Sequence, residues 1–154
     1  MGHCLTEYHS ASPEETHAIG ERLACGLGPG AIIALRGGLG AGKTCLVKGI
    51  ARGLGIAEDI TSPTYTIVSE YNACLDGKSL LPFYHIDAYR LNGDEDFENT
   101  GAGELIAGKG IAIIEWSERI PASIPPDATI IEIEITGPQS RILRIKDSDE
   151  SACH

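Results

Sequence analysis

The chain has 154 residues with 12 Lys and Arg against 22 Asp and Glu, which gives a formal net charge of −10. Its 42% hydrophobic and 22% charged residues are typical of a globular domain, and no apolar run reaches the roughly 20 residues that cross a bilayer. Nucleic-acid affinity depends on clustered Lys and Arg. Because the 12 basic residues are spread over the whole chain, any RNA or DNA would be held mainly by another protein. We therefore expect one cytoplasmic domain over residues 1–154, with no membrane partner.

Two helices and a buried strand are predicted in the first third of the chain. The first helix begins after Ser12, a capping residue that is followed by Pro13 at the first helical position. Its apolar residues recur at helical spacing until Gly28, at Ile19, Leu23 and Leu27. The run AIIALRG then predicts a strand that is buried on both faces. A second helix, TCLVKGIARGLGI, is expected to end at Gly53 and Gly55.

The rest of the chain is predicted to hold three strands, short helices and a terminal hairpin. TSPTYTIVSEY indicates a loop that leads into a strand, and the strands in LLPFYHIDAYRL and GIAIIEW end at Asp87 and Glu115. The acidic, glycine-rich segment between them predicts one or two short helices. TIIEIEI and RILRIKD alternate apolar and charged residues, which predicts an antiparallel hairpin at a sheet edge, with Glu opposite Arg and Lys. Residues 1–10 and 147–154 are expected to fray.

The segment between the first strand and the second helix matches a phosphate-binding loop. Gly37, Gly42, Lys43 and Thr44 fit the pattern G-x-x-x-x-G-K-[ST] at every position. Glycines let backbone N–H groups surround a phosphate, while the lysine bridges the β- and γ-phosphates and the threonine hydroxyl ligates Mg²⁺. We expect the nucleotide to lie against Gly37, Gly40, Ala41, Gly42, Lys43, Thr44, Cys45 and Thr64.

The order of elements around this loop predicts the fold class. A buried strand precedes the glycine loop and a helix follows it, which is the context that the motif requires. Further buried strands alternate with helices before the terminal hairpin. The expected fold is α/β: a three-layer αβα P-loop NTPase fold with a mixed, mainly parallel sheet and a C-terminal antiparallel hairpin.

Two acidic residues at strand ends are candidates for metal binding and catalysis. A phosphate loop needs a carboxylate for its metal, normally at the carboxyl end of a neighbouring buried strand. Glu115 and Asp87 both follow such strands, although each alone is also compatible with a solvated strand end. Together they predict a divided role, in which one ligates Mg²⁺ and the other orients the attacking water or the second metal shell. Lys43 completes the catalytic set.

Three further residues have both a functional and a structural interpretation. Thr64 follows Pro63 in a loop, where its hydroxyl either senses the γ-phosphate or makes a local turn. His85 shares a strand face with Asp87 and is interpreted as a hydrogen-bonded core histidine. Trp116, the only tryptophan, is interpreted as a packing residue rather than a partner contact.

ATP is the favoured nucleotide, because the chain lacks the [NT]-K-x-D base reader and the D-x-x-G switch of GTPases. Three functions remain open: an ATPase, a small-molecule kinase, and a binding module that nucleotide gates without turnover. Kinases usually carry an arginine-bearing lid and an acceptor pocket. Only Arg90 and Arg119 lie between Ala88 and the hairpin, which weakens the kinase alternative.

Several motifs in combination resemble the TsaE family. These are GGLGAGKT, SPTYTIVSEY, HIDAYRL and IIEWSE, in this order along the chain. The resemblance implies an ATPase that uses ATP and Mg²⁺ and acts with two other subunits, TsaD and TsaB, in threonylcarbamoyl transfer to adenosine 37 of ANN-decoding tRNAs. Hydrolysis would reset that assembly without passing a phosphoryl group to tRNA, and the tRNA would be contacted only through the complex.

The resemblance also implies roles for individual residues. Lys43 and Thr44 take the phosphate and Mg²⁺ roles, Glu115 takes the Walker B role, and Asp87 takes a metal or catalytic role. Thr64 would belong to a switch-like loop and Trp116 to the functional strand end. The chain departs from the family at Gly38, where an acidic residue is usual, and at Thr100 and Gly103, where the family is more apolar or helix-forming.

Overall fold

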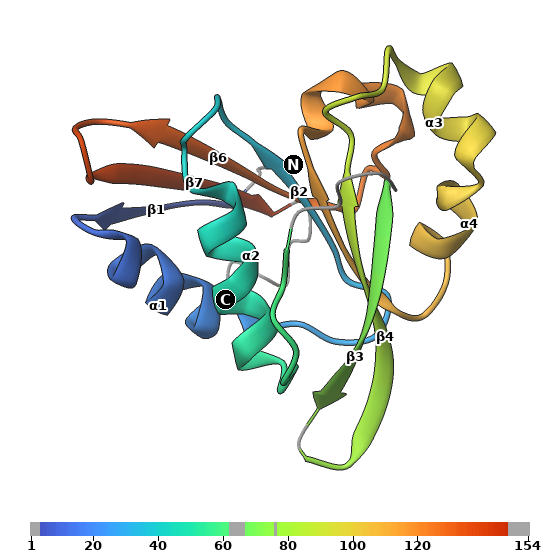
Figure 1. Cartoon of the computed structure of the whole chain (residues 1–154), viewed down its shortest axis with the longest axis horizontal. Helices are drawn as coiled ribbons and strands as arrows, with labels where there is room; N and C mark the ends of the chain where they lie inside the picture. The colour runs from blue at the N-terminus through green and yellow to red at the C-terminus, as the bar shows by residue number, and fades with distance from the viewer. Residues whose placement is uncertain (1–3, 62–66, 76, 148–154) are drawn as a thin grey trace.

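The computed structural model describes residues 4–61, 67–75 and 77–147, which form one seven-stranded sheet with helices on both faces (Figure 1). The sheet order is β1-β7-β6-β2-β5-β4-β3. The strands are β1 Cys4–Ser10, β2 Ile32–Arg36, β3 Val68–Leu75, β4 Ser79–Asp87, β5 Ile111–Glu115, β6 Thr129–Ile135 and β7 Arg141–Asp147. The helices are α1 Pro13–Ala24, α2 Lys43–Gly53, α3 Asp94–Thr100 and α4 Ala102–Ile106, with two short 3-10 turns at Ser117–Arg119 and Pro121–Ser123.

Two hydrophobic cores separate the three layers. Helices α1 and α2 cover one face of the sheet, and α3 and α4 cover the other (Figure 1). Strand β5 supplies both cores by alternation: Ile111 and Ile113 face the α1–α2 side, whereas Ala112 and Ile114 face the α3–α4 side. The predicted αβα arrangement is therefore confirmed.

Helices α1 and α2 approach each other closely because small residues line their contact. A Cβ atom on Gly49 would lie 2.1 Å from the carbonyl oxygen of His17, and one on Gly20 would lie 2.6 Å from that of Leu46. Any larger residue at either position would force the two backbones apart. This contact anchors α2, the helix that follows the glycine loop.

The centre of the sheet is parallel and its flanks are antiparallel. Three parallel pairings join β6, β2, β5 and β4, and three antiparallel pairings add β7, β1 and β3. The sheet is mixed, as predicted, but its parallel part is confined to the four central strands. Consequently the carboxyl ends of β2, β4 and β5 meet at one edge, where Asp87 and Glu115 are register partners.

The expectation that residues 1–10 fray is wrong for Cys4–Ser10. This segment is strand β1, and each of its residues pairs with β7, because the outer edge of β7 would otherwise leave its backbone groups unpaired. The C-terminal hairpin therefore lies inside the sheet, and β1 forms the edge. Asp147 also belongs to a strand, as the last residue of β7, whereas residues 1–3 and 148–154 lie outside the described residues.

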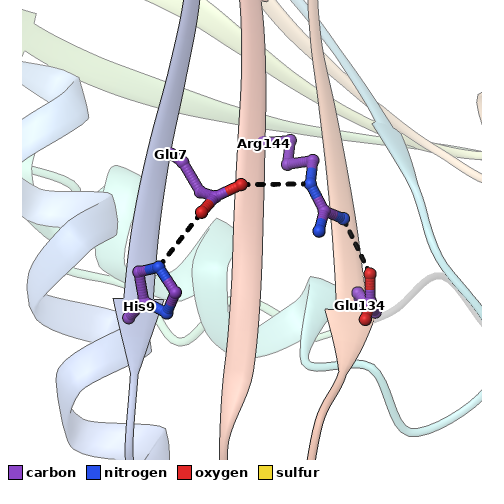
Figure 2. Close-up of polar contacts among 4 residues, drawn as sticks. All are labelled: Glu7, His9, Glu134 and Arg144. Carbon is purple, nitrogen blue, oxygen red and sulfur yellow. Dashed lines mark hydrogen bonds and ion pairs between the residues drawn. The ribbon is translucent and has the colours of Figure 1, made fainter.

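A row of ion pairs links charged side chains of the three neighbouring strands β1, β7 and β6 (Figure 2). Arg144 of β7 donates to Glu7 of β1 at 3.2 Å and to Glu134 of β6 at 2.8 Å. The predicted opposition of Glu and Arg is confirmed, since Glu132 is the register partner of Arg144, but Lys146 faces Ile130 instead of a glutamate. Because these side chains are partly exposed, each ion pair adds little stability.

The remaining elements agree with the expected order. The acidic segment forms two short helices, α3 and α4, as predicted. The first helix ends at Ala24, earlier than the expected stop at Gly28. Within the described ranges, none of the helices is long and apolar enough to cross a membrane.

Candidate functional site

The glycine loop, residues 37–44, joins the end of β2 to the start of α2 in a conformation that needs glycine. Gly40 and Gly42 have φ values of 77° and 100°, in the left-handed region that other residues rarely adopt. Helix α2 begins directly at Lys43, and no side chain caps its first turn. Backbone N–H groups at such a helix start are suited to bind an anion.

A cavity of about 410 Å³ lies in front of this loop and brings the predicted residues together. It is bounded on the other side by the carboxyl ends of β4 and β5. Its lining residues are Leu39, Gly40, Ala41, Gly42, Lys43, Thr44, Cys45, Asp87, Tyr89, Glu115 and Trp116. Of the predicted set, Gly37 lies at the base of the loop rather than in the lining, and Thr64 lies outside the described residues.

The Lys43 ammonium group occupies the middle of the site. Nζ donates hydrogen bonds to the carbonyl oxygens of Gly37 and Gly38 and lies 3.7 Å from the ring centroid of Trp116. Burial lowers the pKa of Lys43, and the negative charges of nearby carboxylates, Glu118 first and then Glu115, oppose that shift. The lysine thus connects the loop with the acidic side of the cavity.

Glu115 and Asp87 are each oriented by a hydrogen bond. Only 3% of Glu115 is exposed, and its Oε2 accepts a hydrogen bond from Nε2 of His85, which is fully buried. Because a carboxylate can only accept, Nε2 carries the proton. Asp87 accepts a hydrogen bond from the backbone N–H of Tyr89 at 3.0 Å. Both carboxyl groups therefore have defined orientations towards the same cavity.

His85 has a more specific role than the one its sequence position indicated. The sequence indicates a hydrogen-bonded core histidine, and His85 is buried, but its partner is the carboxylate of Glu115 on the neighbouring strand β5. Its other ring nitrogen, Nδ1, has no hydrogen-bond partner among the described residues. The sequence places His85 and Asp87 on one face of the strand by alternation. Glu115 could be identified as the partner of His85 only from the register of β4 and β5.

Trp116 faces the cavity, although its position favoured a packing role. Among the described residues it is the only non-glycine residue with a positive φ, at 58°, and such strain is maintained only where the surroundings impose it. The Tyr89 ring lies 4.8 Å from its ring, and the Arg119 guanidinium lies 5.0 Å from the Tyr89 ring. Arg90, the other arginine of this region, is exposed and does not line the cavity.

Cys45 lines the cavity but directs its thiol away from the loop. Its Sγ donates to the backbone oxygen of Pro13 at 3.0 Å. Burial raises the pKa of the Cys45 thiol. Cys45 can therefore contact a ligand through its backbone N–H in the first turn of α2, and not through a thiolate.

The oxygen groups around the cavity fit the ligand preferences of Mg²⁺. The ion prefers carboxylate and hydroxyl oxygens, keeps several waters, and is commonly held by few protein groups together with phosphates. Thr44, Asp87 and Glu115 supply such oxygens around one space. Within residues 4–61, 67–75 and 77–147, no cluster of three or more His, Cys, Asp or Glu forms an all-protein metal cage.

Comparison with known proteins identifies the family. The family model of the threonylcarbamoyl adenosine biosynthesis protein TsaE matches residues 10–143. The chain belongs to the TsaE family. Two relatives are named tRNA threonylcarbamoyladenosine biosynthesis protein TsaE. The Treponema pallidum protein is 39% identical over 136 residues, 88% of this chain and 96% of that protein, and the Bacillus subtilis protein is 40% identical over 135 residues, 88% of this chain and 81% of that protein.

A crystal structure of YdiB from Bacillus subtilis shares the TsaE fold seen here. It aligns with a TM-score of 0.78 and 32% sequence identity, over 98% of this chain and 90% of that chain. The family resemblance and the P-loop fold that the motifs predicted are therefore confirmed. At Gly38, where the resemblance led us to expect an acidic residue, a Cβ atom would meet nothing within 4 Å, so the loop has room for a side chain at this position.

Proposed function

We propose that this protein is a Mg²⁺-dependent ATPase subunit required for threonylcarbamoyl modification of adenosine 37 in ANN-decoding tRNAs. It acts with TsaD- and TsaB-type subunits in the cytoplasm, and ATP hydrolysis resets that complex for another turnover. Membership of the TsaE family and the names of its relatives support the place in tRNA modification. The observation that carries the ATPase part is the single cavity shared by the glycine loop, Lys43 and two oriented carboxylates.

The loop and the start of α2 account for nucleotide binding. Backbone N–H groups at the uncapped start of α2 surround the phosphates, and the Lys43 ammonium exchanges its two carbonyl acceptors for β- and γ-phosphate oxygens. The Thr44 hydroxyl and the Glu115 carboxylate would hold Mg²⁺. The ion, when bound, neutralises charge that develops on the phosphate oxygens.

The strand-end carboxylates account for hydrolysis. Asp87 is the register partner of Glu115 and is free to orient a water towards the γ-phosphorus once Glu115 serves the metal. The water oxygen forms a bond to phosphorus, the bond from phosphorus to the ADP oxygen breaks, and the water proton leaves to solvent or to Asp87. His85 and the backbone of Tyr89 hold the two carboxylates in place.

The isolated chain is expected to hydrolyse ATP slowly. No arginine is among the residues that line the cavity in the described part of the chain, and an arginine supplied by a partner contributes roughly 10³ to 10⁵ in rate to related enzymes. The net charge of −10 suits association with a basic assembly that binds the tRNA itself. Both features favour a subunit that works inside a complex.

Phosphate release from Mg²⁺-ATP tests the proposal, measured with the purified chain alone, with the TsaD and TsaB pair, and with the pair plus tRNA. The expected result is a large increase when the pair is added, abolished by Lys43→Ala. Unchanged turnover in the presence of the pair would contradict the role in the complex. ATP consumption that depends on a small-molecule acceptor, with no protein partner, would instead establish the kinase alternative.

A further inference from the structure

Arg141, the first residue of β7, connects two segments that lie about one hundred residues apart in the chain. Its guanidinium group donates hydrogen bonds to four backbone carbonyls. Two belong to the glycine loop, with Nε donating to Ala41 at 3.0 Å and Nη2 donating to Gly40 at 2.9 Å. Two belong to the turn between β6 and β7, with Nη1 donating to Gly137 at 2.9 Å and to Ser140 at 2.8 Å.

The sheet topology brings this turn to the loop. Strand β6 runs parallel to β2 and extends past its end, since Arg36, the last residue of β2, is the register partner of Glu132. The β6–β7 turn, residues 136–140, therefore lies at the same sheet edge as the glycine loop. Because a guanidinium group is planar and its donors have fixed directions, Arg141 cannot turn away without losing hydrogen bonds on both sides.

These hydrogen bonds orient the peptide groups of the loop. A trans peptide is planar, so its carbonyl oxygen and the N–H of the next residue point in opposite directions. When Arg141 holds the oxygen of Ala41, the N–H of Gly42 is directed away from the guanidinium group. Gly40 and Gly42 have positive φ values and would otherwise sample many conformations. Arg141 therefore limits a segment that its own sequence leaves flexible.

We propose that Arg141 is a positioning residue that presets the glycine loop for nucleotide phosphates, and that it couples the β6–β7 turn to nucleotide affinity. The inference rests on the proposed nucleotide-binding function. Without Arg141, the ordering of the loop has to occur when the nucleotide binds, and its entropic cost is then subtracted from the affinity. The positive charge of the Arg141 guanidinium group beside the loop also favours binding of the negatively charged phosphates.

Isothermal titration calorimetry with Mg²⁺-ADP and with Mg²⁺-ATP measures the effect. Arg141→Gln is expected to weaken both nucleotides by about tenfold to a hundredfold, since hydrogen bonds from a charged donor are lost. Arg141→Lys keeps the charge but has a single donor nitrogen, so its nucleotide affinity is expected to lie between those of the wild type and Arg141→Gln. In ATPase assays KM should rise more than kcat falls, because the loop contacts are made before and during the reaction alike.

Arg144→Gln is the matched control, because it removes the same charge from the same strand. Arg144 donates its hydrogen bonds to Glu7 and Glu134 instead of to the glycine loop (Figure 2). This control should leave nucleotide affinity unchanged. The inference is overturned if both variants weaken ADP equally, or if neither does while Lys43→Ala abolishes binding. If Arg141→Gln does not fold, Arg141→Lys against Arg144→Lys gives the same comparison.

A failure of the proposed function would be distinguishable from a failure of this inference. Wild-type protein that binds neither nucleotide contradicts the function itself. Amide hydrogen exchange at residues 38–42 then still tests the positioning role: faster exchange in Arg141→Gln than in Arg144→Gln supports it, and equal exchange overturns it.

Discussion

Replacing His85 with leucine should lower both stability and ATPase activity. The substitution removes the hydrogen bond to Glu115 and leaves a carboxylate with 4% side-chain exposure facing an apolar group. Breaking a buried, hydrogen-bonded pair on one side costs about 3 to 5 kcal/mol. We take the lower end, about 3 kcal/mol, because Lys43 provides a second favourable charge for Glu115. For a chain of this length that corresponds to a loss of roughly 6 to 12 °C in Tm.

Thermal unfolding and phosphate release are the two assays. His85→Leu is expected to lose about tenfold to a hundredfold in kcat, because Glu115 no longer has a defined orientation towards the metal position. His85→Gln is the control, since its amide nitrogen can still donate to Glu115, and it should retain more of both properties. Combining His85→Leu with Glu115→Gln should cost less stability than the sum of the single changes. A His85→Leu protein with the Tm and kcat of the wild type would refute this reasoning.

Three further predictions address the loop and its supports. Gly49→Ala should lower the free energy of unfolding by about 1 to 3 kcal/mol, measured by urea denaturation, because its Cβ would overlap the His17 carbonyl; an unchanged free energy of unfolding would contradict the close helix contact. Gly38→Glu should change stability by less than about 0.5 kcal/mol in the same assay, since its Cβ enters open space, and a clear loss would show that the loop requires glycine there. Iodoacetamide should modify Cys45 more slowly than exposed Cys25, as burial raises the pKa of Cys45, and Mg²⁺-ADP should slow it further; mass spectrometry that finds equal rates would contradict this.

Local signals were sufficient for much of the fold and for the outline of the site. The glycine loop, the uncapped start of α2 and the buried strands each depend on residue types within a few positions of one another. Asp87 and Glu115 could be paired in advance because parallel strands end at a common edge, and their register confirms that they are neighbours. Strand β1 was missed because a short polar strand without buried alternation differs little from a frayed terminus, and β7 is what orders it.

The sequence by itself determined which groups are available: a lysine and a threonine after a glycine loop, and two carboxylates that end buried strands. Only the tertiary structure decided how they are held. In each of three contacts the two partners come from separate elements: the His85–Glu115 hydrogen bond, the packing of Lys43 on the Trp116 ring, and the hydrogen bonds from Arg141 to the glycine loop. The physical reason is that spacing along a strand or helix specifies the direction of a side chain, whereas its partner depends on strand register and on turns far away in the chain.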